Sequence, residues 1–390
     1  MTTGSTPQVA PSHASVVVIG GGIMGAATAH YLAEAGVEDV VLVERDELGS
    51  GSTSKAAGGL RSQFSDEVNI ALGARSLETF RRFATDFDHD IDLVTSGYLF
   101  LLDNDEDAAA FERNVALQQS LGQASRMVSV AEAAALSPII STTGLVAGAF
   151  NPEDAHCTPE AAVAGFARAA RRRGVTVCKH TEVTGIVVEN GAVTGVETSR
   201  GPIATDTVVC AAGVWSQALG AMAGVELPVT PLRRQIMVTE PVDFDARSLP
   251  FTIDFSTSFY FHSEGDGLLM GAPEVADVRE FDMHRDPEWA EHLSGLISRR
   301  APALEDVCVR SGWAGLYECT PDHNALIGSA EEVSGFLYAC GFSGHGFLQG
   351  PAVGEVMRDL YLGRQPFVDV SPMGVGRFST DELRVELNIV

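Results

Sequence analysis

The hydrophobic pattern is clearest near the start of the chain, where a strand, a helix and a second strand follow one another. Residues 16–19 are a run of β-branched side chains, which is typical of a strand buried on both faces of a parallel sheet. A glycine cluster follows, then a helix-compatible stretch from Ile23 to Ala35, and Gly36 is placed to end that helix. Residues 40–44 predict the second strand. The pattern therefore predicts one βαβ unit.

The rest of the chain alternates between helical and strand-like patterns. Helices are expected at residues 66–87, 105–121, 130–136, 159–172 and 287–299, with a last helix that ends near Leu362. Strands are expected at residues 99–102, 181–188, 192–198, 208–213, 235–239, 259–262, 268–270, 308–316 and 335–339. Asn190-Gly191 lies between two of these strands and is a strong hairpin signal.

Segments of βαβ type lie at the beginning, middle and end of the chain, and strands of antiparallel character lie between them. We therefore expect a combined α/β and α+β fold, in which a doubly wound, Rossmann-like domain is interleaved with a mainly antiparallel β-sheet domain. The first domain would take residues 1–85, 145–225 and 320–390, and the second residues 86–144 and 226–319.

Composition narrows the function classes. A chain of 390 residues with 45% hydrophobic and 20% charged side chains is an ordinary folded globule. Its net charge of −26 argues against binding to nucleic acids or anionic membranes. The six cysteines are scattered without a C-x-x-C pair, so we expect neither a disulfide framework nor a metal site. No signal peptide and no membrane-spanning run is visible, and we expect a cytoplasmic location.

The glycine cluster carries a nucleotide-binding fingerprint. Gly20, Gly22 and Gly25 form G-x-G-x-x-G between the first strand and the first helix, and Glu44 ends the second strand. A carboxylate there accepts ribose hydroxyls and disfavours the 2′-phosphate of NADP. The motif alone leaves FAD and NAD open. The small polar loop at residues 49–54 favours a flavin wrapped by backbone and hydroxyl groups, with a flexible surface turn as the alternative.

Five ordered motifs together resemble the FAD-dependent amino-acid oxidase and sarcosine oxidase superfamily. The resemblance is closest to the β-type catalytic subunits of heterotetrameric sarcosine oxidase and dye-linked proline dehydrogenase. The motifs are residues 16–44, 49–61, 210–216, 312–322 with Ile327-Gly328 behind them, and 341–347. The resemblance implies one FAD per chain, with the first domain binding FAD and the second covering the substrate.

The resemblance assigns cofactor contacts residue by residue. They are Gly20, Gly22, Ile23, Met24, Gly25, Glu44, Arg45, Ser52, Thr53, Ser54, Lys55, Gly58, Gly59, Leu60, Val183, Ala212, Gly213, Trp215, Gly315, Gly344, His345, Gly346, Phe347 and Leu348. Val183 matches the position that meets the adenine. Backbone amides of residues 344–347, at a helix N-terminus, would stabilise the negative charge of a reduced flavin. The role of Lys55 stays open.

The resemblance also implies catalytic positions. Arg61 matches the arginine that pairs with a substrate carboxylate, for which its planar fork is suited; a surface arginine at a helix entry is the alternative. Tyr260 and His262 lie two residues apart on a strand and so share a face, which is either the pocket wall or an ordinary half-buried strand face. His345 has either a direct chemical role or a packing role.

The chain departs from the family at several positions. Leu269 and Leu348 stand where monomeric sarcosine oxidases carry lysines, the first of which activates dioxygen, so dioxygen and a protein or quinone both remain candidate electron acceptors. Cys319 lies near the position of the flavin-tethering cysteine, but in a context typical of the non-covalent branch, which predicts non-covalent FAD. Pro159 stands at the place of a histidine that holds FMN in heterotetrameric sarcosine oxidase, so no second flavin is expected.

These features predict an FAD-dependent oxidoreductase. We expect it to oxidise the C–N bond of a small, carboxylate-bearing secondary amino acid, N-methyl or cyclic, by hydride transfer to flavin N5, giving an imine that hydrolyses. A 2-hydroxy-acid oxidase or dehydrogenase, an electron-transferring dehydrogenase subunit and a non-catalytic FAD-stabilised subunit are the alternatives. Homo- and hetero-oligomers are both compatible with the resemblance.

Overall fold

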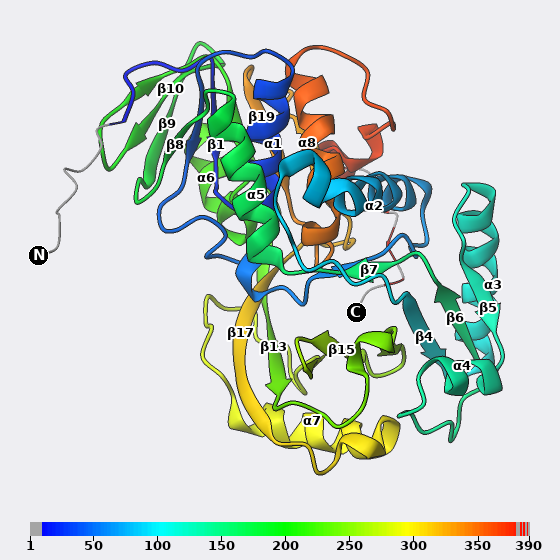
Figure 1. Cartoon of the computed structure of the whole chain (residues 1–390). Helices are drawn as coiled ribbons and strands as arrows, with labels where there is room; N and C mark the ends of the chain where they lie inside the picture. The colour runs from blue at the N-terminus through cyan, green and yellow to red at the C-terminus, as the bar shows by residue number, and fades with distance from the viewer. Residues whose placement is uncertain (1–9, 380–382, 384, 387, 389–390) are drawn as a thin grey trace, which may run out of the picture.

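The computed structural model describes residues 10–379, 383, 385–386 and 388, which form two large sheets joined by long connections (Figure 1). The first sheet has six strands in the order β18-β19-β12-β1-β2-β8. These are β18 (Leu326–Ser329), β19 (Phe336–Cys340), β12 (Val208–Cys210), β1 (Val16–Ile19), β2 (Val40–Val43) and β8 (Thr176–Cys178). All neighbours are parallel except β18, which runs antiparallel to β19.

Both faces of this sheet are covered. On one face lie α1 (Ile23–Glu34), α2 (Glu67–Phe87), α5 (Pro159–Arg172) and α8 (Gly346–Tyr361). On the other lie α6 (Ser216–Ala223) and a three-stranded sheet of β9 (Val183–Glu189), β10 (Ala192–Thr198) and β11 (Ile203–Ala204). Val16 and Val18 pack under the helices, whereas Val17 and Ile19 pack under the small sheet. A strand buried on two sides explains why β1 has no polar position.

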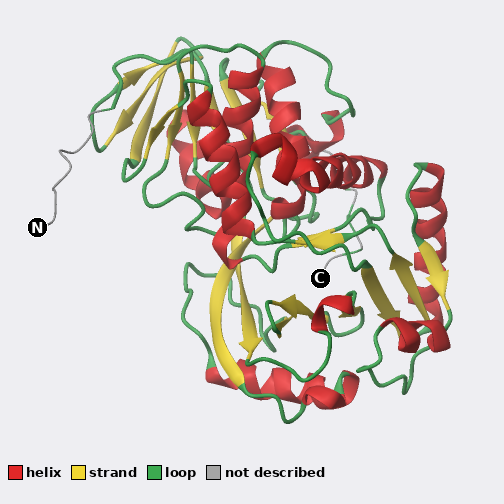
Figure 2. Ribbon diagram, in the orientation of Figure 1, coloured by secondary structure: helices red, strands yellow, loops and turns green. Residues whose placement is uncertain are grey.

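The second sheet has eight strands in the order β17-β13-β16-β15-β14-β4-β6-β5. These are β17 (Val309–Cys319), β13 (Thr230–Thr239), β16 (Gly267–Ala272), β15 (Phe259–Glu264), β14 (Phe251–Asp254), β4 (Tyr98–Leu102), β6 (Ala147–Asn151) and β5 (Arg126–Val128). Its pairs are antiparallel except β14 with β4. Three helices pack against it: α3 (Asp105–Ser120), α4 (Val130–Leu136) and α7 (Pro287–Arg300). Figure 2 shows that helices are denser around the first sheet.

The expected fold class is confirmed: a mixed parallel sheet carries the glycine fingerprint, and a largely antiparallel sheet lies beside it. The predicted helices and longer strands are found within a few residues. The hairpin at Asn190-Gly191 joins β9 to β10, and both turn residues have positive φ, 52° and 77°, as its tight turn requires.

The strands that the sequence pattern missed are short. They are β3 (Gly59–Leu60), β5, β6, β7 (Ala155–His156), β8, β11, β14 and β18. Their two to five residues are too few to display a period of two. β6 belongs to the eight-stranded sheet, although it lies within the residues 145–225 that the sequence assigned to the FAD-binding domain. Among the described residues, no helix combines the length and apolarity needed to cross a membrane.

One buried ion pair ties α7 to the second sheet. Arg300 Nε lies 3.0 Å from Asp254 Oδ2, and both side chains are 1% exposed. Arg300 also donates to the carbonyl oxygen of Ser141 at 2.8 Å. The guanidinium therefore neutralises a carboxylate that has almost no access to water.

Arg300→Met should lower the free energy of unfolding by about 3–5 kcal/mol, because it leaves the Asp254 carboxylate buried without its partner. The double variant Arg300→Met/Asp254→Leu should recover most of that loss. Urea unfolding followed by circular dichroism measures both. A single variant that is as stable as the double variant would show that the pair does not have this role.

Candidate active site

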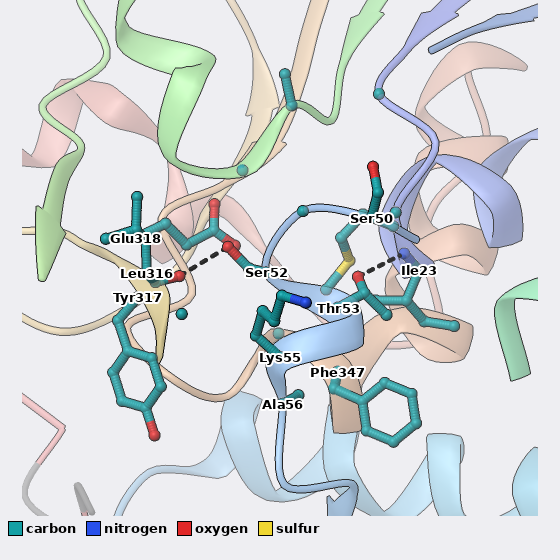
Figure 3. A pocket seen from close by; sticks show the side chains of 18 of the residues that line it. Ile23, Ser50, Ser52, Thr53, Lys55, Ala56, Leu316, Tyr317, Glu318 and Phe347 are labelled. Atoms are coloured by element: carbon teal, nitrogen blue, oxygen red, sulfur yellow. Dashed lines mark hydrogen bonds between the residues drawn. The ribbon is translucent and has the colours of Figure 1, made fainter. Parts of the chain in front are cut away.

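A cavity of about 650 Å³ lies between the two sheets, at the carboxyl ends of the parallel strands β1 and β2. That edge of a doubly wound sheet is where ligands bind. Most of the predicted site residues line it: Gly20, Gly22, Ile23, Met24, Glu44, Arg45, Ser52, Thr53, Lys55, Gly58, Gly59, Arg61, Val183, Ala212, Gly213, Trp215, Tyr260, Gly315, Gly344, His345, Gly346, Phe347 and Leu348. Figure 3 shows several of them around the loop that crosses the cavity.

The glycine turn between β1 and α1 brings backbone close to backbone. Gly20 has a φ of 112°, and a side chain there would collide with the carbonyl oxygen of Ala211. Gly25 does not line the cavity, because it faces the turn: a side chain there would collide with the carbonyl oxygen of Gly20. Gly25 thus has the packing role expected of the third glycine, and the first two let the cavity reach the backbone.

The N-terminus of α1 points into the cavity with little protein capping. Its N-cap residue, Gly22, makes no side-chain hydrogen bond, and Thr53 Oγ1 accepts from the Ile23 N–H at 3.2 Å (Figure 3). Beside it, Glu44 accepts from the Gly21 N–H at 2.7 Å and from the Asp46 N–H at 2.8 Å. A helix N-terminus next to a fixed carboxylate suits a pyrophosphate followed by a ribose.

A loop of small residues links the two domains across the cavity. Ser52 Oγ donates to the carbonyl oxygen of Leu316 in β17 at 2.7 Å (Figure 3). Trp313 Nε1 donates to the carbonyl oxygen of Lys55 at 3.1 Å. A side chain at Gly315 would collide with the Lys55 side chain, so glycine permits this approach. Ser54 does not line the cavity, since its hydroxyl faces the carbonyl oxygens of the same loop.

The first turn of α8 forms a second helix N-terminus at the cavity. Its N-cap residue, His345, makes no side-chain capping bond, and its ring packs edge-on against Phe64 with 5.0 Å between centroids. Burial, with the positive charge of Arg61, holds the pKa of His345 well below its ordinary value. The imidazole is therefore neutral, and its Nε2 has no partner among the described residues.

Arg61 is buried at the cavity wall, with 4% of its surface exposed. Its guanidinium donates to the carbonyl oxygens of Gln63 and, at 2.6 Å, Asn388, and it lies 4.2 Å from the Phe64 ring centroid. No carboxylate of the described residues forms an ion pair with it. The alternative of a surface arginine is wrong. Burying a cation without an anionic partner costs free energy, and an anion bound in the cavity would offset that cost.

Asp154 supports the segment that carries Arg61. Its carboxylate accepts from the Ser62 N–H at 3.0 Å, from Ser62 Oγ at 3.2 Å and from Gln63 Nε2 at 3.1 Å. Burial raises the pKa of Asp154 to about 7, because no solvent reaches the charged form. Gln63 Oε1 has no partner among the described residues, so a protonated Asp154 has an acceptor close by.

Three aromatic rings form the wall on the second-sheet side. Tyr98 stacks on Phe251 with 4.2 Å between centroids, and Phe251 stacks on Tyr260 with 5.4 Å between centroids. Burial raises the pKa of both tyrosines well above its ordinary value, so both phenols are neutral. The wall is therefore uncharged and largely apolar.

His262 and Leu60 do not reach this wall, which corrects the expectation of a catalytic His262. The His262 ring lies behind Phe251, 4.6 Å between centroids, and packs against His156 at 4.4 Å. Burial lowers the pKa of His262 to about 4, so the ring is neutral. Leu60 is fully buried in the core under α2. The shared strand face predicted that Tyr260 lines the cavity, and it does. It could not show that the His262 ring lies deeper, behind Phe251.

Cys319 is buried and lies outside the cavity wall. Burial raises its pKa to about 11, so its thiol is unreactive at neutral pH.

Leu269 packs in the core of the second sheet and does not line the cavity, whereas Leu348 does. Glu318 does line it; burial raises its pKa to about 7, and it accepts from the Gly341 N–H at 2.9 Å.

Sequence reasoning missed other wall residues. They include Gly21, Tyr98, Arg234, Ile236, Phe251, Ile253, Met283, Tyr317 and Glu318. Tyr317 and Glu318 stood inside a recognised motif and could have been named from it. Phe251 and Ile253 lie on a four-residue strand that gave no detectable pattern.

Comparison with known proteins gives consistent matches over most of the chain. The sequence model of the family described as FAD dependent oxidoreductase matches residues 15–360. Human mitochondrial sarcosine dehydrogenase is 33% identical over 94% of this chain, which spans 42% of that protein. The FAD-dependent oxidoreductase domain-containing protein 1 of Xenopus laevis is 31% identical, with 99% of this chain and 86% of that protein covered.

Among solved structures, L-proline dehydrogenase from P.horikoshii superposes with a TM-score of 0.91 and 34% sequence identity. The match covers 96% of this chain and 100% of that one. The expected family resemblance and the expectation of an FAD-dependent oxidoreductase are confirmed.

Asp154→Asn should remove a pH dependence of stability. The unfolded aspartate has a pKa near 3.8 and the folded one near 7, so unfolding between these values releases a proton and is favoured by rising pH. The free energy of unfolding of the wild type should therefore fall relative to the variant by about 1–2 kcal/mol between about pH 5.5 and 8.

Urea unfolding at several pH values measures this difference, with the exposed Asp105→Asn as control. If the wild-type and Asp154→Asn curves run parallel across this range, Asp154 does not hold a proton in the folded state.

Proposed function

The chain belongs to the FAD-dependent oxidoreductase family, and we propose that it oxidises the C–N bond of a small secondary amino acid, N-methylated or cyclic. One observation carries the proposal: Arg61 is buried without a carboxylate partner in the cavity that begins at the nucleotide-binding turn. A cation in that position is suited to hold the substrate's carboxylate beside the flavin.

The described residues fit FAD. The N-termini of α1 and α8 both face the cavity without side-chain caps, one suited to the pyrophosphate and the other to the negative end of a reduced flavin. When bound, FAD supplies the hydride acceptor that oxidation of a C–N bond needs. We propose that one FAD binds per chain without a covalent bond, since Cys319 lies outside the cavity and has an unreactive thiol.

The protein's own groups orient the substrate and select its protonation state. Arg61 fixes the carboxylate, and the stacked rings of Tyr98, Phe251 and Tyr260 exclude water. Arg234 places a second positive charge on the same cavity. The uncharged, apolar wall disfavours an ammonium ion by desolvation, so the amine binds with its lone pair free, as oxidation requires.

The secondary-amine preference is supported by the relatives. Sarcosine and L-proline, which the names of the two enzymes above give, are both secondary amino acids. The chain spans about two fifths of the length of the human and mouse sarcosine dehydrogenases, so the likeness concerns the part that matches.

Arg61→Gln should weaken the binding of sarcosine and L-proline by about tenfold to a hundredfold, because a charge-assisted hydrogen bond is lost. The affinity of Arg61→Lys should lie between those of the wild type and Arg61→Gln, since lysine keeps the positive charge but cannot form two parallel hydrogen bonds with a carboxylate. Anaerobic titration followed by flavin absorbance gives the apparent affinities. The exposed Arg82→Gln is the matched control. Equal affinities in wild type and Arg61→Gln, or bleaching by 2-hydroxy acids and not by amines, would contradict the proposal.

Acid precipitation of the purified protein should leave FAD in the supernatant at about one per chain and a colourless pellet, because none of the described cysteines lines the cavity. Absorbance of the supernatant and flavin fluorescence of the denatured chain on a gel measure the two fractions. A yellow pellet or a fluorescent band would show covalent attachment.

A further inference from the structure

Two neighbouring arginines on β13 have opposite surroundings. Arg233 is paired with Glu274 at 2.6 Å and with Asp282 at 2.7 Å, so its charge is neutralised. Arg234 points the other way and lines the cavity together with Ile236, as residues two apart on a strand do. Only one of the two is therefore available to a ligand.

Arg234 has weak protein partners. Its nearest carboxylate, Asp277, is 3.7 Å away and instead makes a closer contact of 2.9 Å with Arg279. One guanidinium nitrogen donates to the carbonyl oxygen of Arg233 at 3.0 Å, and Nε is buried without a partner among the described residues. Its guanidinium also lies 5.6 Å from the Tyr317 ring centroid, and, like Arg61, it has no carboxylate at hydrogen-bonding distance among the described residues.

Arg61 and Arg234 reach the aromatic wall from different parts of the fold. Gln63, two residues after Arg61, donates to the carbonyl oxygen of Tyr98 at 3.1 Å. Arg234 lies two residues before Ile236, whose partner on β16 is also the strand partner of Tyr260. The Phe251 ring lies between these two tyrosines in the stack. The cavity wall thus carries two cationic groups together with the stacked rings and Tyr317, whose ring centroid lies 5.6 Å from the Arg234 guanidinium.

The carboxylates that line this cavity lie elsewhere. Glu44, Asp46, Glu47 and Glu182 belong to the segments around β2 and β9, where the nucleotide is proposed to bind. Glu318 is bonded to the Gly341 backbone N–H and lies near Gly346 at the start of α8. Among the described residues, no carboxylate of the cavity wall forms an ion pair with Arg61 or Arg234.

We propose that the substrate is a secondary amino acid with a second carboxylate, which Arg234 holds while Arg61 holds the carboxylate next to the reacting carbon. The proposal rests on the proposed function, because it needs the first carboxylate at Arg61. A short aliphatic spacer between the two carboxylates would lie along the stacked rings. A chain of net charge −26 repels a dianion at long range, so recognition depends on these two local charges.

The test compares ligands that differ only in the second charge. Calorimetric titration of the FAD-loaded protein with glutarate and with glutaric acid monoamide measures the preference without turnover. The wild type should bind glutarate about tenfold to a hundredfold more tightly, since the acid makes a charge-assisted bond with Arg234 that the amide lacks. Anaerobic flavin reduction by N-methylglutamate and N-methylglutamine, each enantiomer separately, gives the same comparison for substrates.

Variants assign the preference to one residue. Arg234→Gln should bring the ratio of acid to amide affinity close to one. Arg234→Lys keeps the positive charge and should retain much of the preference for the acid. Arg310→Gln, which removes an exposed arginine of β17 outside the cavity, should leave the ratio unchanged.

The outcomes separate the two proposals. Equal affinity for acid and amide in the wild type, with flavin reduction by sarcosine or L-proline intact, overturns the second-carboxylate site and leaves the proposed function standing. Failure of every amine to reduce the flavin overturns the proposed function. A preference that survives in Arg234→Gln shows that another group holds the second carboxylate, and so also overturns the assignment.

Discussion

The close approach of α1 to β1 is the constraint on which the rest of the molecule depends. Gly25 lets the first turn of the helix lie against the Gly20 backbone, and any side chain there would force the two elements apart. This contact aims the positive end of α1 at the carboxyl edge of the parallel sheet. The loop after β2, the first turn of α8 and the second sheet all meet at that edge and close one cavity around it.

Within this frame, charge is distributed unevenly. The chain as a whole is strongly acidic, yet the cavity carries Arg61 and Arg234 beside an uncharged aromatic wall formed by the second sheet. Arg61 keeps its place through the backbone carbonyls of Gln63 and Asn388, and Asp154 braces the neighbouring segment. Carbonyl groups hold the guanidinium without forming an ion pair with it, so its charge is available to an anionic ligand.

Much of the architecture could be predicted because it depends on local signals. The β-branched run of β1, the glycine spacing before α1 and the turn at Asn190-Gly191 each follow from a few adjacent residues. Short strands such as β6 and β14 escaped, since a few residues paired to distant partners have no pattern of their own. The residues around the glycine turn could be predicted because they lie in contiguous motifs. Tyr98 and Phe251 lie in no such motif, and they were not predicted.

By itself, the sequence determined the cofactor class, the nucleotide-binding turn and the candidacy of Arg61, because these reside in contiguous motifs whose backbone geometry is dictated by residue type. Only the tertiary structure decided which side chains share the cavity. It buried Arg61, set His262 behind Phe251, and left Arg234 facing the ligand space while saturating Arg233 with carboxylates. How deeply a side chain is buried and which ion pairs it forms depend on segments far apart in the chain. Contacts between such segments cannot be predicted from the neighbouring residues alone.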